Sequence, residues 1–390
     1  MTLRGVARRS RWCIGVAMCV AFVGCDGGGG EEDARAPTLN ARVALELGVL
    51  EGDPAQEFGQ VMNAVKLSDG RIAVADSRST DVRVFGADGT HTGAMGRRGR
   101  GPGEIAALTR LWADSADNLT FGSATKIVRF DSYGEFLDEK ILDWTVLSRP
   151  DYGADSSWPL HGDTQLVMLI ESSRAQPRQE GLIRPGRVLL LATAQGEELD
   201  SIGYFPGVEQ FTYRTGTGYD TAVLLFPAYS HQAIGKTRIV FGDLAADSVL
   251  LYEPRTRESR WLKVPVEPLP IDPATLDAAR EAACEWASEG DLRANCEAGV
   301  ARLPAQTHYP AMRDIAVDSA GHVWVSKYAE AAAGTVAEWL VLDDAGEPTA
   351  RVLLPVEFRP TQIGDGYVLG ITTDDLGVNR IVEFRIDGMR

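Results

Sequence analysis

The chain has 390 residues, with 39 lysines and arginines against 55 aspartates and glutamates, and its formal net charge is −16. Hydrophobic residues make up 44% and charged residues 24%, a balance that is typical of a folded globular protein and excludes general disorder. The acidic charge also argues against a nucleic-acid partner, because binding to the phosphate backbone depends on clustered lysines and arginines.

The first 24 residues have the features of an export signal. Four arginines and no acidic residue occupy residues 1–11, and an apolar run follows over residues 12–24. This run is too short to cross a bilayer as a helix, but it has the length of a signal-peptide core. We therefore predict a signal peptide at residues 1–24 and an exported protein.

The export signal ends at a cysteine. Residues 22–25 read Phe-Val-Gly-Cys and are followed by Asp26 and four glycines. This junction resembles the lipobox of bacterial lipoproteins, although Phe22 stands where leucine is usual. The resemblance implies that Cys25 carries a lipid and anchors the protein to a membrane of the bacterial cell envelope. Residues 25–40 are then a flexible linker. The alternatives are a protein that is simply secreted and one that keeps this segment as an uncleaved anchor.

The sequence that follows the linker is repetitive. Each copy contains a turn rich in Asp, Gly or Asn, a short β-type run, a polar loop, a second run, an Asp-x-x-Gly-like turn and a third run. Six copies cover residues 69–96, 117–141, 163–203, 236–264, 320–354 and 365–388. Repeats of about 40 to 50 residues with four short strands are the signature of propeller blades.

Strands outside the copies complete the predicted blades. An innermost strand is expected before individual copies, at residues 60–67, 107–113 and 311–318. The last copy ends almost at the C-terminus, and residues 41–49 can supply the strand that it lacks. We therefore predict an all-β fold over residues 41–390: a six-bladed β-propeller with four-stranded blades, closed by its own N-terminal strand.

Two stretches resemble known propellers. The segment GRRGRGPGEI (96–105), which follows GRIAVADSRSTDVRVFGADG, resembles the NHL-repeat type. The C-terminal third, with HYPAMRDIAVDSAGHVWV and GDGYVLGITTDDLGVNRIVEFRI, is similar to bacterial six-bladed β-propeller lipoproteins of uncharacterised role. The resemblance covers essentially all of residues 41–390 and is thin over 150–215. It implies the fold and export, and it brings no catalytic residues.

Residues 271–304 interrupt the repeats with a composition that is typical of helices. Cys284 and Cys296 lie at equal distances on either side of Gly290, so a helical hairpin that turns there places them opposite each other. In an oxidising, exported environment we predict a disulfide between Cys284 and Cys296, with two free thiols as the alternative.

The sequence contains no evident catalytic or metal motif. Its histidines form no HxH or HExxH pattern, and GxSxG, GxGxxG and Walker-type loops are missing. Asp314 and Asp318 are candidate ligands for a cation, but similarly placed acids do not recur in the other copies, and solvated turns explain both. We expect no cofactor and no metal site, and keep a divalent cation in the central channel as an alternative.

Two sets of residues are candidates for ligand binding. Loops that enter the innermost strands line the mouth of a propeller channel. Their aromatic residues and arginines suit an anionic or carbohydrate-like ligand; they are Arg110, Trp112, Tyr229, His231, Tyr309, Arg313 and Arg359. The second set is a basic loop with Arg97, Arg98 and Arg100, which could grip an anion or could form an inter-blade turn whose arginines meet neighbouring acids.

Together these features favour an exported, membrane-tethered propeller that binds or scaffolds a protein, small-molecule or glycan ligand. One alternative is a metal-dependent hydrolase or lyase with its site in the channel. The other is an assembly partner in the envelope that docks through residues 271–304. Membrane contact is expected through the N-terminal lipid, and nucleic acid is not expected as a partner.

Overall fold

The computed structural model describes residues 36–389, except residues 124, 161, 173–178, 217, 288–289, 329–334 and 375. The predicted signal peptide, Cys25 and the linker up to Arg35 lie outside these residues. Neither of the two helices in the described part has the length and hydropathy that a membrane crossing requires.

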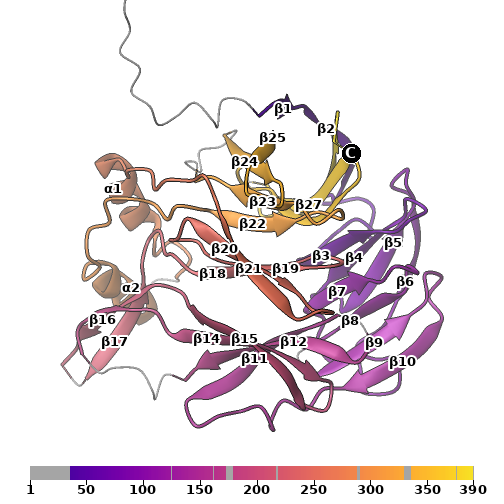
Figure 1. Ribbon diagram of the computed structural model, residues 1–390, viewed down its shortest axis with the longest axis horizontal. Coiled ribbons are helices and arrows are strands. Elements are labelled where there is room, and N and C mark those ends of the chain that lie inside the picture. Colours follow the sequence, from indigo (N-terminus) through magenta and orange to yellow (C-terminus); the bar gives the residue numbers. More distant parts are fainter. Residues whose placement is uncertain are drawn as a thin grey trace, which may run out of the picture. The chain divides into compact units, whose positions relative to one another are not determined.

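Six antiparallel sheets follow one another along the chain and form the blades of a propeller (Figure 1). Blades 1 and 2 consist of β3 (Val61–Lys66), β4 (Ile72–Asp76), β5 (Asp81–Phe85) and β6 (His91–Met95), then β7 (Arg110–Ala113), β8 (Leu119–Gly122), β9 (Lys126–Phe130) and β10 (Phe136–Ile141). Blades 3 and 4 consist of β11 (Tyr152–Pro159), β12 (Thr164–Glu171), β14 (Gly186–Thr193) and β15 (Glu198–Pro206), then β18 (Ser230–Ile234), β19 (Ile239–Asp243), β20 (Ser248–Glu253) and β21 (Glu258–Lys263). Blades 5 and 6 contain β22 (Asp314–Val317), β23 (Val323–Ser326), β24 (Val336–Leu342) and β25 (Pro348–Pro355), then β26 (Arg359–Gly364), β27 (Tyr367–Thr373) and β28 (Asn379–Ile386).

The N-terminal strand β2 (Ala41–Leu47) completes blade 6. It pairs antiparallel with β28, with Ala41 opposite Ile386 and Leu47 opposite Ile381. The prediction of a six-bladed propeller closed by its first strand is therefore confirmed. The innermost strands expected before three of the copies are β3, β7 and β22.

The end of the predicted linker is ordered. Thr38 and Leu39, which the sequence places in the linker, form β1 and pair in parallel with Arg351 and Val352 of β25. Leu39 packs against the hydrophobic core between blades 5 and 6, which explains why the strand begins earlier than predicted. The chain thus contacts blade 5 before it completes blade 6.

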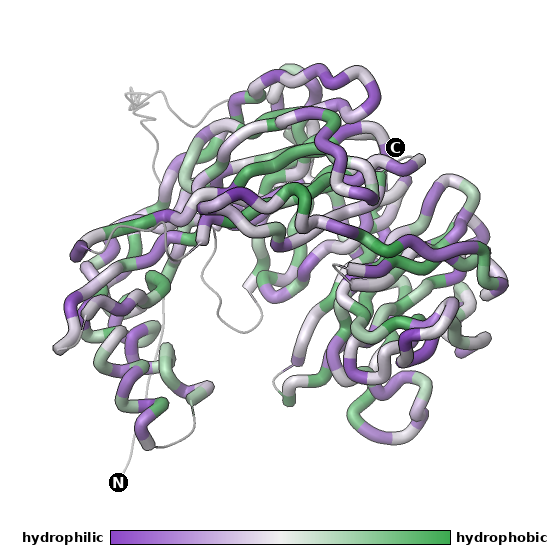
Figure 2. The backbone as a smooth tube through the Cα atoms, turned by 90° about the horizontal axis from the view of Figure 1, so that it is seen from below, coloured by the Kyte–Doolittle hydropathy of each residue, from purple (hydrophilic) through white to green (hydrophobic). Residues whose placement is uncertain are grey.

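The hydrophobic core lies between the blades. In the described part of the chain, six clusters of buried residues each join two consecutive blades. One of them contains Leu47, Val74 and Ile381 and joins blade 6 to blade 1, so the ring is closed by packing as well as by hydrogen bonds. Figure 2 shows hydrophobic stretches along the strands and hydrophilic residues on many of the turns.

The two faces of the propeller differ in their connections. On one face, here called the turn face, short turns join the first strand of a blade to the second and the third to the fourth. In two of these turns Asp131 and Asp343 each accept hydrogen bonds from the backbone N–H groups two and four residues further on. Gly134 and Gly346 follow with φ of 92° and 89°, which glycine adopts without strain.

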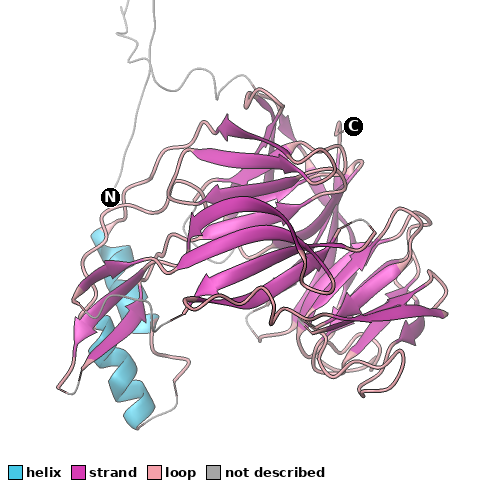
Figure 3. Ribbon diagram, turned by 60° about the horizontal axis from the view of Figure 1, so that its bottom comes forward, coloured by secondary structure: helices cyan, strands magenta, loops and turns pink. Residues whose placement is uncertain are grey.

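The opposite face, here called the insertion face, carries the longer connections. Three of them contain elements outside the blade pattern. A three-stranded sheet consists of β13 (Gly181–Ile183), β16 (Gln210–Arg214) and β17 (Tyr219–Val223), and two helices, α1 (Pro273–Ala282) and α2 (Asp291–Val300), lie between blades 4 and 5. Helix α2 contacts β17, and Figures 1 and 3 show the helices beside this sheet. The sequence predicts the helices but not the sheet.

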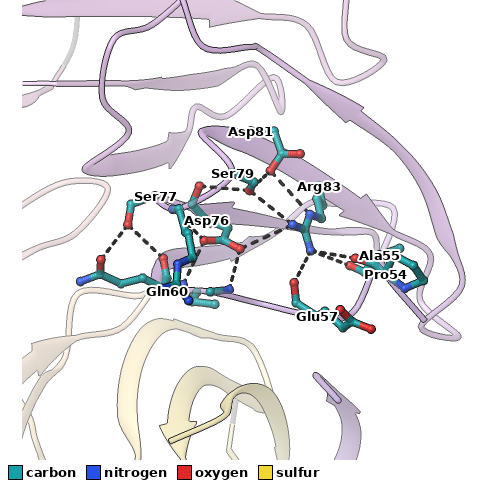
Figure 4. A network of polar contacts seen from close by, with 12 residues as sticks. Pro54, Ala55, Glu57, Gln60, Asp76, Ser77, Ser79, Asp81 and Arg83 are labelled. Atoms are coloured by element: carbon teal, nitrogen blue, oxygen red, sulfur yellow. Dashed lines mark hydrogen bonds and ion pairs between the residues drawn. The ribbon is translucent and has the colours of Figure 1, made fainter. Parts of the chain in front are cut away.

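The connection from β2 to blade 1 is held by a buried carboxylate, shown in Figure 4. Asp76, at the end of β4, is 1% exposed and accepts hydrogen bonds from the backbone N–H groups of Gly59 (2.9 Å) and Gln60 (3.0 Å). Arg83 lies 3.5 Å from the same carboxylate and donates to the carbonyl oxygens of Ala55 (3.0 Å) and Glu57 (2.9 Å). One ion pair therefore fixes residues 55–60 onto blade 1.

The cysteines of the helical insertion are joined by a disulfide. Cys284 follows α1, Cys296 lies in α2, and their Cα atoms are 5.9 Å apart. Asp272 caps α1 by accepting a hydrogen bond from the N–H of Ala274 at 3.2 Å. The hairpin is thus fixed at its start by a capping residue and near its turn by a covalent bond.

Replacing both cysteines by serine is expected to lower the stability of the folded chain by about 2–3 kcal/mol, because the closed loop restricts the unfolded chain. The measurement is urea unfolding followed by circular dichroism under oxidising conditions. A reductant should lower the stability of the wild-type protein to that of the variant and leave the variant unchanged. Equal stability of the two proteins without reductant would contradict this account.

Candidate functional site

The insertion face is where the blades are free to differ from one another. The first strand of each blade begins there, at Val61, Arg110, Tyr152, Ser230, Asp314 and Arg359. The connections on this face include residues 207–229 and 264–313, whereas the turns on the other face are as short as residues 114–118 and 365–366. Binding residues are concentrated on loops held by a rigid scaffold, so we searched this face for a site.

A pocket of about 250 Å³ opens where blades 4, 5 and 6 meet, and is here called the channel-mouth pocket. Its lining is mostly aromatic and charged. The lining residues are Pro227, Tyr229, Leu244, Pro310, Met312, Arg313, Asp314, Ser326, Tyr328, Trp339, Val356, Glu357, Phe358 and Arg359. Because these side chains come from three blades, the pocket exists only in the assembled ring.

Two arginines of this pocket have no carboxylate partner in the described part of the chain. The Arg313 guanidinium makes no hydrogen bond or ion pair there, and Arg359 makes one long hydrogen bond, of 3.4 Å, to the carbonyl oxygen of Met62. Burial lowers the pKa of Arg359, and the negative charge of Asp314 acts in the opposite direction and raises it. By contrast, Arg184 and Arg380 each contact an aspartate at 2.8–2.9 Å. The channel-mouth pocket therefore holds two guanidinium groups with unused donors.

Asp314 lies among groups that can donate hydrogen bonds to a ligand. One of its oxygens is 3.4 Å from Nε2 of His231. Burial raises the pKa of Tyr229 to about 12, with Asp314 as the next cause, so its hydroxyl remains protonated at neutral pH. Burial also raises the pKa of Tyr328, which lines the same pocket. Both tyrosines thus present O–H donors.

A second group of charged residues lies on blades 2 and 3, on strands β7, β11 and β14. The Arg110 guanidinium donates to the carbonyl oxygen of Ser157 at 2.5 Å and lies over the ring of Trp158, 4.6 Å from its centre. Arg187 donates to the carbonyl oxygen of Ser230 at 2.9 Å and so links blade 3 to blade 4. Burial lowers the pKa of both arginines, and Asp155 opposes this effect at each of them.

The structure brings some of the predicted channel residues together and separates others. Tyr229, Arg313 and Arg359 line the channel-mouth pocket, and His231 contacts its Asp314. Arg110 lies on blade 2, beside Asp155, and Trp112 is on the same strand, β7, where it is half-buried. Tyr309 is buried and lines a different pocket, described below.

Sequence reasoning missed Arg187, Asp155, Tyr328 and Glu357. Arg187 and Asp155 belong to the least regular copy, and Tyr328 follows the second strand of its blade rather than preceding the first. Glu357 stands two residues before Arg359, in the same loop. This closeness in sequence to a predicted channel residue was the one feature that could have identified Glu357 as part of the site.

The basic loop before blade 2 is occupied by acidic side chains of the protein. Arg97 pairs with Glu104 at 2.7 Å, and the N–H of Gly101 donates to the same glutamate at 2.9 Å. The N–H of Gly103 donates to Glu139 at 2.9 Å. Arg98 and Arg100 are exposed. The guanidinium of Arg97 and the N–H groups of Gly101 and Gly103 are therefore already used by carboxylates of the protein.

Within the described ranges, no three or more His, Cys, Asp or Glu side chains gather in a way that could hold a metal ion. Asp318 accepts hydrogen bonds from the N–H groups of Ala320, Gly321 and His322 in its own turn, at 2.8–3.0 Å. It also accepts one from Nε1 of Trp324 at 3.2 Å. Asp318 thus organises a turn on the turn face, away from Asp314 at the channel mouth.

Comparisons with known proteins bear on the fold. No curated protein sequence matches the chain. Among solved structures it is similar to a member of the DUF4221 family from Bacteroides vulgatus, with 9% identity, a TM-score of 0.48, and coverage of 90% of this chain and 99% of that one. It is also similar to virginiamycin B lyase from Staphylococcus aureus, with 11% identity, a TM-score of 0.41, and coverage of 89% and 99%. Residues 50–156 match a protein family described as "6-bladed beta-propeller", in agreement with the six sheets of the structure.

Proposed function

We propose that this protein is an exported, lipid-anchored binding propeller that takes a carboxylate-bearing ligand in the channel-mouth pocket. The observation that carries the proposal is the pair Arg313 and Arg359, which lack a carboxylate partner in the described residues although acidic residues outnumber basic ones by 55 to 39. In such an acidic chain, an arginine in a pocket is expected to pair with one of the protein's own carboxylates, unless the fold holds those carboxylates out of its reach.

The chemistry of the pocket suits a carboxylate. A guanidinium group presents a planar fork of N–H donors that matches the two oxygens of a carboxylate, and its attraction is stronger where protein displaces water. The hydroxyls of Tyr229 and Tyr328 supply further donors, and Trp339 and Phe358 supply apolar surface for the rest of the ligand. Asp314 and Glu357 limit the excess of positive charge in the pocket.

Changing either arginine to alanine is expected to weaken binding of a carboxylate probe at least tenfold, because a charge-assisted hydrogen bond contributes about 1.5–3 kcal/mol. The measurement is isothermal titration of the wild-type protein, Arg313→Ala and Arg359→Ala with succinate and with D-glucuronate. Glucose serves as the neutral ligand.

The matched control is Arg255→Ala, because Arg255 is an exposed arginine in residues 254–257, a turn of the turn face. This variant loses the same charge and should bind like the wild-type protein. Equal affinity of Arg313→Ala and wild type, or equal affinity for glucose and glucuronate, would overturn the proposed site.

Anchoring has a separate test. Cys25→Ser should move the protein from the membrane fraction to the soluble fraction of the envelope, since the lipid is attached to the cysteine and no other anchor is proposed. Fractionation followed by immunoblotting measures this, and Cys19→Ser, within the predicted signal peptide, is the control for losing a cysteine. A Cys25→Ser protein that stays with the membrane would contradict lipid anchoring.

A further inference from the structure

A second and larger cavity lies beside the channel-mouth pocket, above blade 4. It measures about 600 Å³ and is here called the insertion pocket. Its lining residues are Glu209, Phe226, Ala228, Ala245, Glu267, Pro268, Gln306, His308, Tyr309, Pro310 and Ala311. Almost all of these belong to residues 207–229 and 264–313, the two connections that carry β16, β17 and the helices.

The walls of the insertion pocket are fixed by contacts between these two connections. Gln306 accepts a hydrogen bond from the N–H of Phe226 (3.1 Å) and donates one to its carbonyl oxygen (2.8 Å). The ring of Phe226 meets that of Tyr309 edge-on at 4.9 Å, and both pack in a small cluster with Leu276 of α1. The helical insertion therefore supports one side of a preformed cavity.

The polar lining of this pocket contains two carboxylates, Glu209 and Glu267, beside Gln306 and His308. Glu209 is half-buried and Glu267 is exposed at the rim, and neither forms an ion pair within the described residues. Glu209 accepts a hydrogen bond from the N–H of Ala228 at 3.3 Å, which holds its carboxylate in place. Carboxylates that share a pocket with aromatic rings, here those of Phe226 and Tyr309, are a combination that recognises an ammonium group on an apolar stem.

The two pockets are neighbours. Both are lined by Pro310, and the chain passes from one to the other at residues 228–229, 244–245 and 311–312. One pocket thus holds two arginines without a carboxylate partner, and the adjoining pocket holds two glutamates without an ion pair, all within the described residues. A ligand that satisfies both pockets carries a carboxylate and an ammonium group separated by several bonds.

We infer that the ligand is a peptide whose terminal carboxylate meets Arg313 and Arg359 and whose lysine-type side chain enters the insertion pocket. This inference rests on the proposed carboxylate site and adds the chemical class of its ligand. A tripeptide spans about 10 Å when extended, which suits two adjoining pockets. The extra sheet and the helical insertion then serve to build the part of the site that selects the basic side chain.

The test uses three probes with the intact protein in isothermal titration: acetyl-Lys-Ala-Gly, its norleucine analogue without the ammonium group, and its C-terminal amide. The lysine peptide should bind at least tenfold more tightly than the norleucine peptide. Glu209→Gln with Glu267→Gln should abolish this preference and leave the affinity for the norleucine peptide unchanged. Glu267→Gln alone is a second test that does not depend on how the change at Glu209 affects folding, because Glu267 is exposed. It should reduce the preference for the lysine peptide over the norleucine peptide.

Glu347→Gln is the matched control, because Glu347 is an exposed glutamate on the turn face and should leave the preference intact. Equal binding of the lysine and norleucine peptides, or failure of all three probes to bind while succinate binds, overturns the peptide inference and leaves the carboxylate site standing. Equal binding of the acid and the amide, together with no effect of Arg313→Ala, overturns the carboxylate site itself.

Discussion

Replacing Asp76 by alanine is expected to destabilise the propeller by about 3–5 kcal/mol, because it removes one of the two carboxylates that lie 3.5 Å from the largely buried Arg83 and leaves it with Asp81 alone. The change also leaves the backbone N–H groups of Gly59 and Gln60 without the acceptor that they use in the folded protein. Both effects act on the connection that links the closing strand to blade 1. Urea unfolding followed by tryptophan fluorescence measures the loss.

Two further variants show whether the charge or the acceptor matters more. Asp76→Asn keeps one oxygen acceptor but removes the charge, so its stability should lie between those of the wild-type protein and Asp76→Ala. Asp88→Ala removes an exposed aspartate of the same blade and should change the unfolding midpoint little. A loss for Asp76→Ala no larger than that for Asp88→Ala would show that the network in Figure 4 does not support the fold.

A loss of similar size, about 3–5 kcal/mol, is expected for Glu383→Ala at the seam between blades 6 and 1. Lys66 places its Nζ 2.7 Å from both oxygens of Glu383, and the side chains are 17% and 5% exposed. The same ammonium group lies 4.6 Å from the centre of the Tyr367 ring. Removing the glutamate leaves a positive charge in a site from which water is largely excluded.

The double variant Lys66→Met with Glu383→Leu separates the cost of an unpaired charge from the contribution of the pair. It should recover most of the stability that Glu383→Ala loses, because apolar residues of similar size often replace a buried ion pair at little cost. The same unfolding experiment measures it. If the double variant is as unstable as Glu383→Ala, packing rather than unpaired charge explains the loss.

The blades could be predicted from the sequence because each of them repeats the same local chemistry. The alternation of β-branched with polar residues and the Asp-x-x-Gly turns are encoded within a few residues, as Asp131 and Gly134 illustrate. The closing strand was also predictable, because the last copy is one strand short. Thr38 and Leu39 were not, because the partners of that short strand lie on blade 5, far along the chain.

The candidate site was less predictable because it is built where the repeat is interrupted. Tyr229, Arg313 and Arg359 could be named since they immediately precede or begin innermost strands. Arg187 and Tyr328 could not, because the positions that reach the channel mouth from other strands depend on how neighbouring blades pack. In the sheet of β13, β16 and β17, the paired strands β13 and β16 are separated by two blade strands, β14 and β15, and no local pattern encodes that pairing.

The pairing of β2 with β28 also sets the order in which the molecule can fold. The two strands are among the first and last parts of the domain to be synthesised, and Arg42 and Asp387, which form an ion pair between them, are 345 residues apart in sequence. Contacts of such long range form slowly, because the entropy of closing the loop must be overcome before they stabilise anything. Blades 1 to 5 can therefore assemble while the chain is still emerging, but β2 has to wait with an unpaired edge until the last blade arrives. During that interval the exposed edge is open to pairing with another chain, so the rate of ring closure limits how much protein escapes aggregation.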